Sequence, residues 1–215
     1  MSKSILISIR PKYVEKILNG EKTLEIRTTI PKEWKEYLGG KTSVKPAPNK
    51  WYIYCTNGNI LYDLSKCGVD DLERKVKEKK NKRFVLSDLK SNNIIGSSVS
   101  FANRKVVAEF TLNEINCLPS IRYKANGAFY QYNKVSDEIL KKSCLTQEQI
   151  LNYTNGNDLY ALHIEDLEIY DKPKELSEFT HNVPNYSNGV VMYSLKKEPL
   201  KRPFQSWGYV NGTDN

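Results

Sequence analysis

In the stretch N-G-E-K-T-L-E-I-R, residues Asn19–Arg27, a short helix is expected to end on a glycine and to be followed by a strand that carries charge. Read with a period of two, Leu24 and Ile26 point to one face of a strand, because successive side chains in a strand alternate between its faces. Glu25 and Arg27 point to the other face. One face of this strand therefore belongs to a core, and the other carries charge.

Lys22 stands directly before this strand, so an ammonium, a carboxylate and a guanidinium fall within roughly 10 Å along the chain, at ~3.3 Å per residue. Such a grouping is costly to hold together unless something binds there. The alternative is a solvated face with cross-strand ion pairs, which needs no ligand. The spacing of Lys22, Glu25 and Arg27 fits both interpretations.

The preceding residues predict a strand and a short helix. Ile5–Ile9 is apolar on both faces apart from Ser8, which is typical of a central strand. Pro11 favours the first turn of a helix, and apolar residues recur at helical spacing as far as Leu18. Gly20 then favours a left-handed helix end. A strand, a helix and a returning strand together deliver the charged residues.

This opening resembles the ASCH domains of the PUA-like superfamily. Their pattern is G-x-K-x-x-E-x-R, and its fixed positions are filled here by Gly20, Lys22, Glu25 and Arg27. The later part of the chain is similar to ASCH proteins of the phage and Firmicute type. The resemblance implies a cleft for a nucleobase or RNA.

The fold class implied by the resemblance is α+β, a PUA-like mixed β-barrel with a few short flanking helices and a large insertion. We expect a single domain over residues 1–215, with barrel segments at about 4–55 and 104–209. The region at about 57–104 is expected to be an elaboration, because its Gly, Asn and Ser content is high and its periodicity is poor.

The charged residues suit the recognition of a nucleotide. Arg27 could fork onto a phosphate or a carbonyl edge, and Glu25 could accept a hydrogen bond from an exocyclic amine or hold its two cationic neighbours in place. Lys22 could bind phosphate as a point charge. The resemblance thus implies an RNA- or nucleotide/nucleobase-binding protein with a basic cleft and no cofactor. Further candidates for ligand contact are Ser8, Arg10, Tyr54 and Trp207.

Two other functions stay open. ASCH relatives include amidohydrolases of N4-acylated cytidine and some ribonucleases, which implies a hydrolase with Lys22 as its base. A threonine occupies the position of Glu25 in the amidohydrolase branch, so the expected nucleophile is missing and the sequence favours a protein that is not an enzyme. The phage-like resemblance also allows a protein that sequesters a nucleotide signal.

Composition favours an anionic partner. The net charge is +8 and the pI is about 9.1, which attracts phosphates without choosing among them. No apolar run approaches the ~20 residues of a membrane span, and the N-terminus does not read as a signal peptide. The four cysteines are scattered without a C-x-x-C pair, so we expect free thiols, no metal and a cytoplasmic location. The oligomeric state is left open.

The rest of the chain predicts further elements. Strands are expected at Trp51–Cys55 and Arg104–Leu112 because of their aromatic, branched and alternating residues. Residues 118–143 are expected to be irregular. Thr146 predicts the start of a helix, with Gln149 completing a capping box.

Several remaining features have a structural and a functional interpretation. The basic run Arg74–Arg83 is either a solvated segment or an arm for nucleic acid. Tyrosines near Lys124 could stack bases or pack in loops. His163 is expected to be a satisfied structural group rather than a base, and Lys174–Phe179 to be one or two turns of helix. The aromatic tail around Trp207 is expected to fold back, either onto the core or into the cleft.

Overall fold

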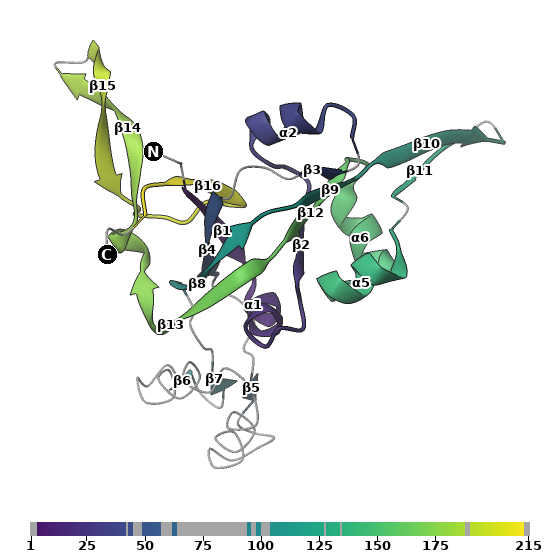
Figure 1. Ribbon diagram of the computed structural model, residues 1–215, viewed down its shortest axis with the longest axis horizontal. Helices are drawn as coiled ribbons and strands as arrows, with labels where there is room; N and C mark the ends of the chain where they lie inside the picture. Colours follow the sequence, from purple (N-terminus) through teal and green to yellow (C-terminus); the bar gives the residue numbers. More distant parts are fainter. Residues whose placement is uncertain are drawn as a thin grey trace. The chain divides into compact units, whose positions relative to one another are not determined.

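The computed structural model describes residues 4–41, 43–44, 49–56, 62–63, 94–95, 98–99, 104–126, 128–133, 135–187 and 190–212. The chain divides into two compact units whose segments alternate along the sequence. Figure 1 labels the helices and strands of both units. The first unit contains Met1–Asn19, Asn49–Phe110 and Leu167–Asn215, and the second contains Gly20–Pro48 and Thr111–Asp166. That all residues form one domain stays a prediction.

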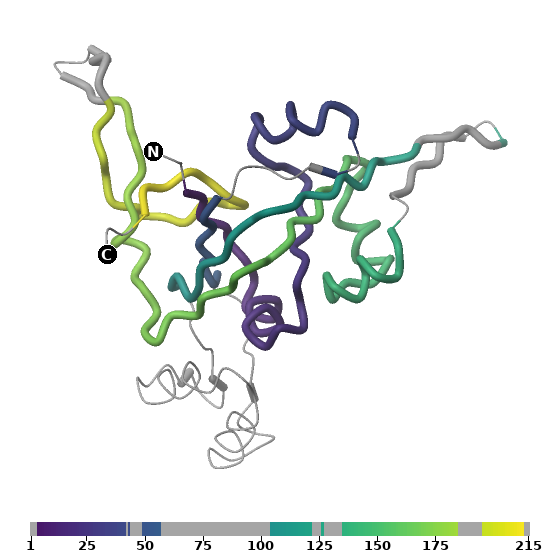
Figure 2. Tube along the Cα trace, in the orientation of Figure 1, coloured from purple at the N-terminus to yellow at the C-terminus, as the bar shows by residue number. Residues whose placement is uncertain are grey.

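The first unit is built on a five-stranded sheet. Its strand order is β13 (Glu165–Glu175), β8 (Lys105–Leu112), β4 (Asn49–Cys55), β1 (Ser4–Ile9) and β16 (Trp207–Val210). β1 pairs in parallel with β4 and antiparallel with β16. In Figure 2, β1 is the purple segment and β16 is the yellow segment beside it. The apolar run that predicted a central strand is confirmed, because β1 has a partner on each side and is almost wholly buried.

Helix α1 (Pro11–Leu18) follows β1 as predicted. Pro11 occupies its first turn, and Val14, Ile17 and Leu18 face the core. Gly20 has a φ of +74°, a left-handed conformation that glycine adopts without strain, and this ends the helix before β2.

The two faces of the five-stranded sheet carry different side chains, as the alternation in β4 predicted. Trp51 and Ile53 are fully buried on one face, where Trp51 lies 5.9 Å from Phe110 between ring centres. Tyr52 and Tyr54 lie on the other face, in a hydrophobic cluster that includes residues far along the chain. The other members of this cluster are Leu6, Val106, Tyr170, Phe179, Leu200 and Val210, with Leu176 and Phe204 packed against them.

The C-terminal part of the first unit forms a hairpin and then returns to the sheet. β14 (Thr180–Ser187) and β15 (Val190–Pro199) pair antiparallel. A short 3-10 helix, η1 (Leu176–Glu178), precedes them where one or two turns of helix were predicted. The aromatic tail folds back as expected, since it forms β16 beside β1.

The second unit contains a four-stranded sheet covered by two helices. Its strand order is β2 (Leu24–Arg27), β12 (Leu159–His163), β9 (Ile115–Leu118) and β3 (Ser43–Val44). Helices α5 (Asp137–Ser143) and α6 (Gln147–Thr154) contribute Ile139, Leu140 and Ile150 to the cluster around Leu24 and Ile26. The apolar face predicted for β2 therefore packs in a core.

The prediction of an irregular region at residues 118–143 is wrong. The structure places β10 (Ser120–Ala125), β11 (Ala128–Asn133) and α5 there, and β10 and β11 form an antiparallel hairpin. The missed helix has a recognisable start, because the Ser136 side chain accepts a hydrogen bond from the Ile139 amide. Seven residues are too few for helical periodicity to stand out.

The remaining described elements are short. α2 (Lys32–Leu38) ends at Gly39, and β5 (Tyr62–Asp63), β7 (Ser98–Val99) and β6 (Ile94–Ile95) form a three-stranded sheet. The basic run Arg74–Arg83 lies outside the described residues.

The α+β class is confirmed by this inventory of helices and strands. Within the described ranges, the strands form five separate hydrogen-bonded sheets rather than one closed ring. None of the helices in the described part of the chain is long and apolar enough to cross a membrane.

Candidate functional site

The three charged residues of the predicted site meet at β2 and the turn before it. Lys22 is 2% exposed, and Glu25 and Arg27 are each 8% exposed. The Lys22 Nζ lies 3.2 Å from Glu25 Oε2, and an Arg27 Nη lies 3.1 Å from Glu25 Oε1. The sequence therefore located a buried cluster of ions, which we call the β2 charge cluster.

Lys22 is held by the backbone of two separate segments. Its ammonium donates to the carbonyl oxygens of Leu24 and Ser143, each at 2.7 Å. With the Glu25 carboxylate, these acceptors match the three N–H bonds of an ammonium. Ser143 ends α5, where carbonyls lack helical partners and positive charge is favourable. Lys22 thus joins the start of β2 to the end of a helix 121 residues away in sequence.

Glu25 is shared between the two cations. One carboxylate oxygen faces Lys22 and the other faces Arg27, so the β2 charge cluster carries two positive charges against one negative charge. Glu25 offsets one cation and fixes the position of both. Charged donors that are held in place in this way favour a negative or strongly polar group as a ligand.

The strand register places Arg27 in a row with two other reactive groups. Arg27 is opposite Tyr160 on β12, and Tyr160 is opposite Cys117 on β9. Directly opposed residues share one face of a sheet. Burial raises the pKa of the Tyr160 phenol and of the Cys117 thiol, so both groups keep their protons at neutral pH. Sequence reasoning missed Tyr160 and Cys117, whose places follow only from the pairing.

His163 lies on the opposite face of β12 from this row, because it pairs with Leu24. Its Nε2 is 2.6 Å from Asn116 Oδ1, and the Asn116 amide donates to Glu114. Ser43 donates to the same Glu114 oxygen at 2.9 Å. Since the Asn116 amide is a donor to Glu114, its oxygen accepts from His163. This series of hydrogen bonds favours the structural interpretation of His163.

The other predicted contact residues lie in the first unit. Ser8 is opposite Tyr54 in the β1–β4 register, and its hydroxyl donates to the Phe204 carbonyl at 2.6 Å. Arg10 is exposed at the start of α1. Trp207 pairs with Ile7, and its ring lies 5.9 Å from that of Tyr209. The structure brings Lys22, Glu25 and Arg27 together, and it places these other four residues in the other compact unit.

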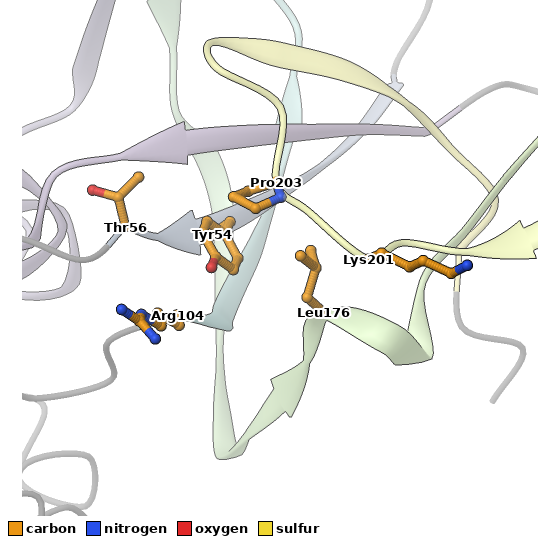
Figure 3. Close-up of a pocket in the computed structure, with 6 residues that line it drawn as sticks. All are labelled: Tyr54, Thr56, Arg104, Leu176, Lys201 and Pro203. Atoms are coloured by element: carbon orange, nitrogen blue, oxygen red, sulfur yellow. The ribbon is translucent and has the colours of Figure 1, made fainter.

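Tyr54 also lines a hollow of about 380 Å³ in the first unit, which we call the Tyr54 pocket (Figure 3). Its other lining residues are Thr56, Arg104, Leu176, Lys201 and Pro203. Sequence reasoning identified only Tyr54 among them, because the lining comes from segments far apart in the chain.

Among the described residues, no group of three or more His, Cys, Asp or Glu side chains could hold a metal ion. The three cysteines in this part of the chain, Cys55, Cys117 and Cys144, are free.

Comparison with known proteins finds similar solved structures, but it does not assign the chain to a family. No family model matches the chain, and no curated protein matches it. The chain is similar to the crystal structure of ASCH from Zymomonas mobilis, with 15% identity and a TM-score of 0.42 over 81% of this chain and 74% of that one. A mutant of the same Zymomonas mobilis protein gives 17% identity and a TM-score of 0.40, over 81% of this chain and 76% of that one.

Proposed function

We propose that this protein binds RNA or a nucleotide, and that the β2 charge cluster contacts the ligand. The proposal includes a place in the ASCH family, of the phage and Firmicute type, a single PUA-like domain and a cytoplasmic location. It takes its support from the pattern that Gly20, Lys22, Glu25 and Arg27 complete in the sequence.

The observation that carries the proposal is the carboxylate shared by two buried cations. Glu25 contacts both cations and holds them in place where they are shielded from water. Hydrogen bonds from a charged donor to an anionic or carbonyl oxygen are stronger than those between neutral groups. A phosphate or a nucleobase edge offers such oxygens.

Within the cluster, the three residues have different roles. Arg27 presents a planar fork that matches a phosphate or a base carbonyl, and Glu25 orients that fork through an Nη. Lys22 is a positioning residue, because its N–H bonds are directed to two backbone carbonyls and to Glu25. The remaining candidates for ligand contact are Ser8, Arg10, Tyr54 and Trp207.

The hydrolase alternative uses Lys22 as a base, and the geometry around Lys22 disfavours it. A general base must accept a proton, whereas this ammonium donates to carbonyl oxygens at 2.7 Å and contacts a carboxylate, all of which favour its charged form. Incubation with N4-acetylcytidine and with short RNA tests this alternative. Release of acetate or of RNA fragments that is lost in Lys22→Met would overturn the binding proposal.

Calorimetric titration with CMP and with short RNA bearing a 5′-hydroxyl tests the binding proposal. Arg27→Gln is expected to weaken binding about tenfold or more, because hydrogen bonds from a charged group are lost. Arg27→Lys keeps the charge but loses the fork, and it is expected to rescue only part of the affinity. Affinity unchanged in both variants would contradict the proposal.

Lys32→Gln is the matched control for Arg27→Gln. It removes one positive charge from the same unit, but Lys32 is exposed and pairs only loosely with Glu36 at 3.6 Å. We expect the affinity of Lys32→Gln for CMP and for RNA to equal that of the wild type. Equal losses in Lys32→Gln and Arg27→Gln would mean that net charge alone attracts the ligand.

Salt dependence separates the polymer from the mononucleotide. Binding of RNA along its backbone should weaken steeply as salt rises, since each neutralised phosphate releases counterions. A protein that sequesters a nucleotide signal should bind CMP with a shallow salt dependence and gain little from a longer RNA.

A further inference from the structure

We infer that the Tyr54 pocket is a second binding site, which takes a phosphate monoester carried on a small aromatic or apolar body. This site lies in the first unit and shares no residue with the β2 charge cluster. Binding at the Tyr54 pocket can therefore be tested separately from the role of Arg27.

The base of the Tyr54 pocket is fixed by the sheet. Tyr54 is on β4 and is 4% exposed, and the Thr56 amide donates to the Ile9 carbonyl at 2.9 Å. The Arg104 amide donates to the Cys55 carbonyl at 2.8 Å, so the chain that leaves β4 at Thr56 returns beside it at Arg104. Arg104 has a φ of +62°, a conformation uncommon for a residue with a side chain. These bonds hold the backbone of Arg104 at the end of the strand, and its side chain is exposed.

The opposite wall is fixed by contacts of the C-terminal segment. The Leu200 amide donates to the Phe179 carbonyl at 2.8 Å, and the Ser8 amide donates to the Ser206 carbonyl at 2.9 Å. Between these two points, the Ser8 hydroxyl also holds the Phe204 carbonyl. Lys201 and Pro203 thus lie on a loop that is held at both ends and in the middle. A pocket whose walls are already in place loses little entropy on binding.

Arg104 and Lys201 make the lining of the Tyr54 pocket positive, and none of its six lining residues is acidic. The carboxylate of Glu175 acts on Tyr54, and it pairs with Lys105 at 3.2 Å. Figure 3 draws the Tyr54 hydroxyl on the side of the ring toward Arg104, and it draws Lys201 beyond Leu176 with its ammonium pointing away from Tyr54. Burial raises the pKa of the Tyr54 phenol, so this hydroxyl is a donor at neutral pH.

The chemistry of the lining selects the class of ligand. A guanidinium and a phenol at one end can donate to the same anionic group, and Arg104 suits the paired oxygens of a phosphate. Leu176, Pro203 and the Tyr54 ring offer apolar surface for a body attached to that group. The volume falls in the range of small-molecule sites, and it exceeds what an inorganic ion needs. Lys201 is exposed on a flexible stem, so it can add a second positive charge against a dianion.

Calorimetric titration of the full chain with phenyl phosphate tests this inference, with phenol, benzoate and inorganic phosphate as comparisons. We expect phenyl phosphate to bind more tightly than all three, since it alone combines the dianion with the ring. Arg104→Gln is expected to weaken binding of phenyl phosphate about tenfold or more, and Lys201→Gln by a smaller factor.

Two further variants make the result specific. Lys197→Gln removes an exposed positive charge from the same unit, and it is expected to bind phenyl phosphate as the wild type does. Tyr54→Phe keeps the ring and loses the hydroxyl, and it should weaken binding severalfold. Equal affinities in Arg104→Gln and Lys197→Gln would overturn the inference, as would failure of phenyl phosphate to bind at millimolar concentration.

The phosphate could belong to a free nucleotide or to the 5′ end of an RNA. UMP against uridine, and 5′-phosphorylated against 5′-hydroxyl short RNA, distinguish these sources. Arg104→Gln should lower affinity for the phosphorylated member of whichever pair binds and leave the other member unchanged. Equal binding of both members of both pairs would contradict a phosphate site.

Discussion

At the scale of single residues, the main finding is that the Lys22 ammonium binds other groups of the protein itself. A buried ammonium that faces Leu24, Ser143 and Glu25 stabilises the junction between β2 and α5. The alternation of side chains predicted which face carries the charges. No local pattern indicates that the Ser143 carbonyl, 121 residues away, accepts a hydrogen bond from Lys22. This explains why the sequence located the cluster and could not assign the role of Lys22.

We predict that Lys22→Ala lowers the free energy of unfolding by about 2–3 kcal/mol, because two buried carbonyls and a shared carboxylate lose their partner. Urea unfolding followed by circular dichroism measures this loss. Lys32→Ala is the control, since its ion pair with Glu36 is exposed, and its effect should stay within about 0.5 kcal/mol. Equal stability of the two variants would show that Lys22 contributes no more than a surface lysine.

At the scale of helices and strands, local chemistry decided which elements could be predicted. β1, α1, β4, β8 and α6 follow from apolar runs, alternation, Pro11 and the capping box at Thr146, and all of them are present. The β10–β11 hairpin and α5 were missed because they are short and carry mixed residues. The Tyr54 pocket could not be predicted at all, since β4, η1 and the C-terminal loop meet there only through tertiary packing.

We predict that Thr146→Ala lowers the free energy of unfolding by about 1 kcal/mol. The Thr146 hydroxyl accepts from the Gln149 amide at 3.2 Å, and the Gln149 side chain accepts from the Thr146 amide at 3.0 Å. Thermal and urea unfolding measure the change. Thr146→Ser keeps a hydroxyl at the cap and should retain most of the stability. A serine variant as unstable as the alanine variant would contradict this role of the hydroxyl.

A close approach also shapes the C-terminal segment. Gly208 on β16 lies against the Phe204 ring, and a side-chain carbon at this position would overlap with it. Phe204 packs against the cluster around Tyr54, and its carbonyl is held by Ser8. A larger residue at position 208 would therefore have to displace the Phe204 ring, where β16 passes the loop that carries Lys201 and Pro203.

At the scale of the whole molecule, stability depends on charges that join strands far apart in sequence. Glu109 on β8 pairs with Lys50 on β4 and accepts a hydrogen bond from the Tyr170 hydroxyl on β13 at 2.6 Å. Burial alone would raise the pKa of the Glu109 carboxyl. The contacts with Lys50 and Tyr170 outweigh burial and hold that pKa below its ordinary value.

A carboxyl whose pKa is lowered by folding stabilises the native state above its unfolded pKa of 4.5, and this contribution is lost as the pH falls through the folded pKa. We therefore predict that Glu109→Gln is less stable than the wild type by about 1 kcal/mol at neutral pH, a modest value because Lys50 is half exposed. The difference should shrink as the pH falls below 4.5. Urea unfolding at a series of pH values measures it, and a constant difference would contradict the pKa shift.

The net charge of +8 also belongs to this scale, because it attracts anions to the molecule as a whole. General attraction does not explain recognition, which requires groups held in place. The β2 charge cluster and the Tyr54 pocket each supply such groups, and variants of Arg27 and Arg104 separate their contributions.

In the proposed binding site, Arg27 contacts the ligand while Glu25 holds the Arg27 side chain in place. The most direct measurement follows the side-chain NMR resonances of Arg27 while short RNA with a 5′-hydroxyl is added. We expect these resonances to shift and to saturate with the same dissociation constant as the calorimetric titration. RNA binding that leaves the Arg27 resonances unmoved would contradict this role of Arg27.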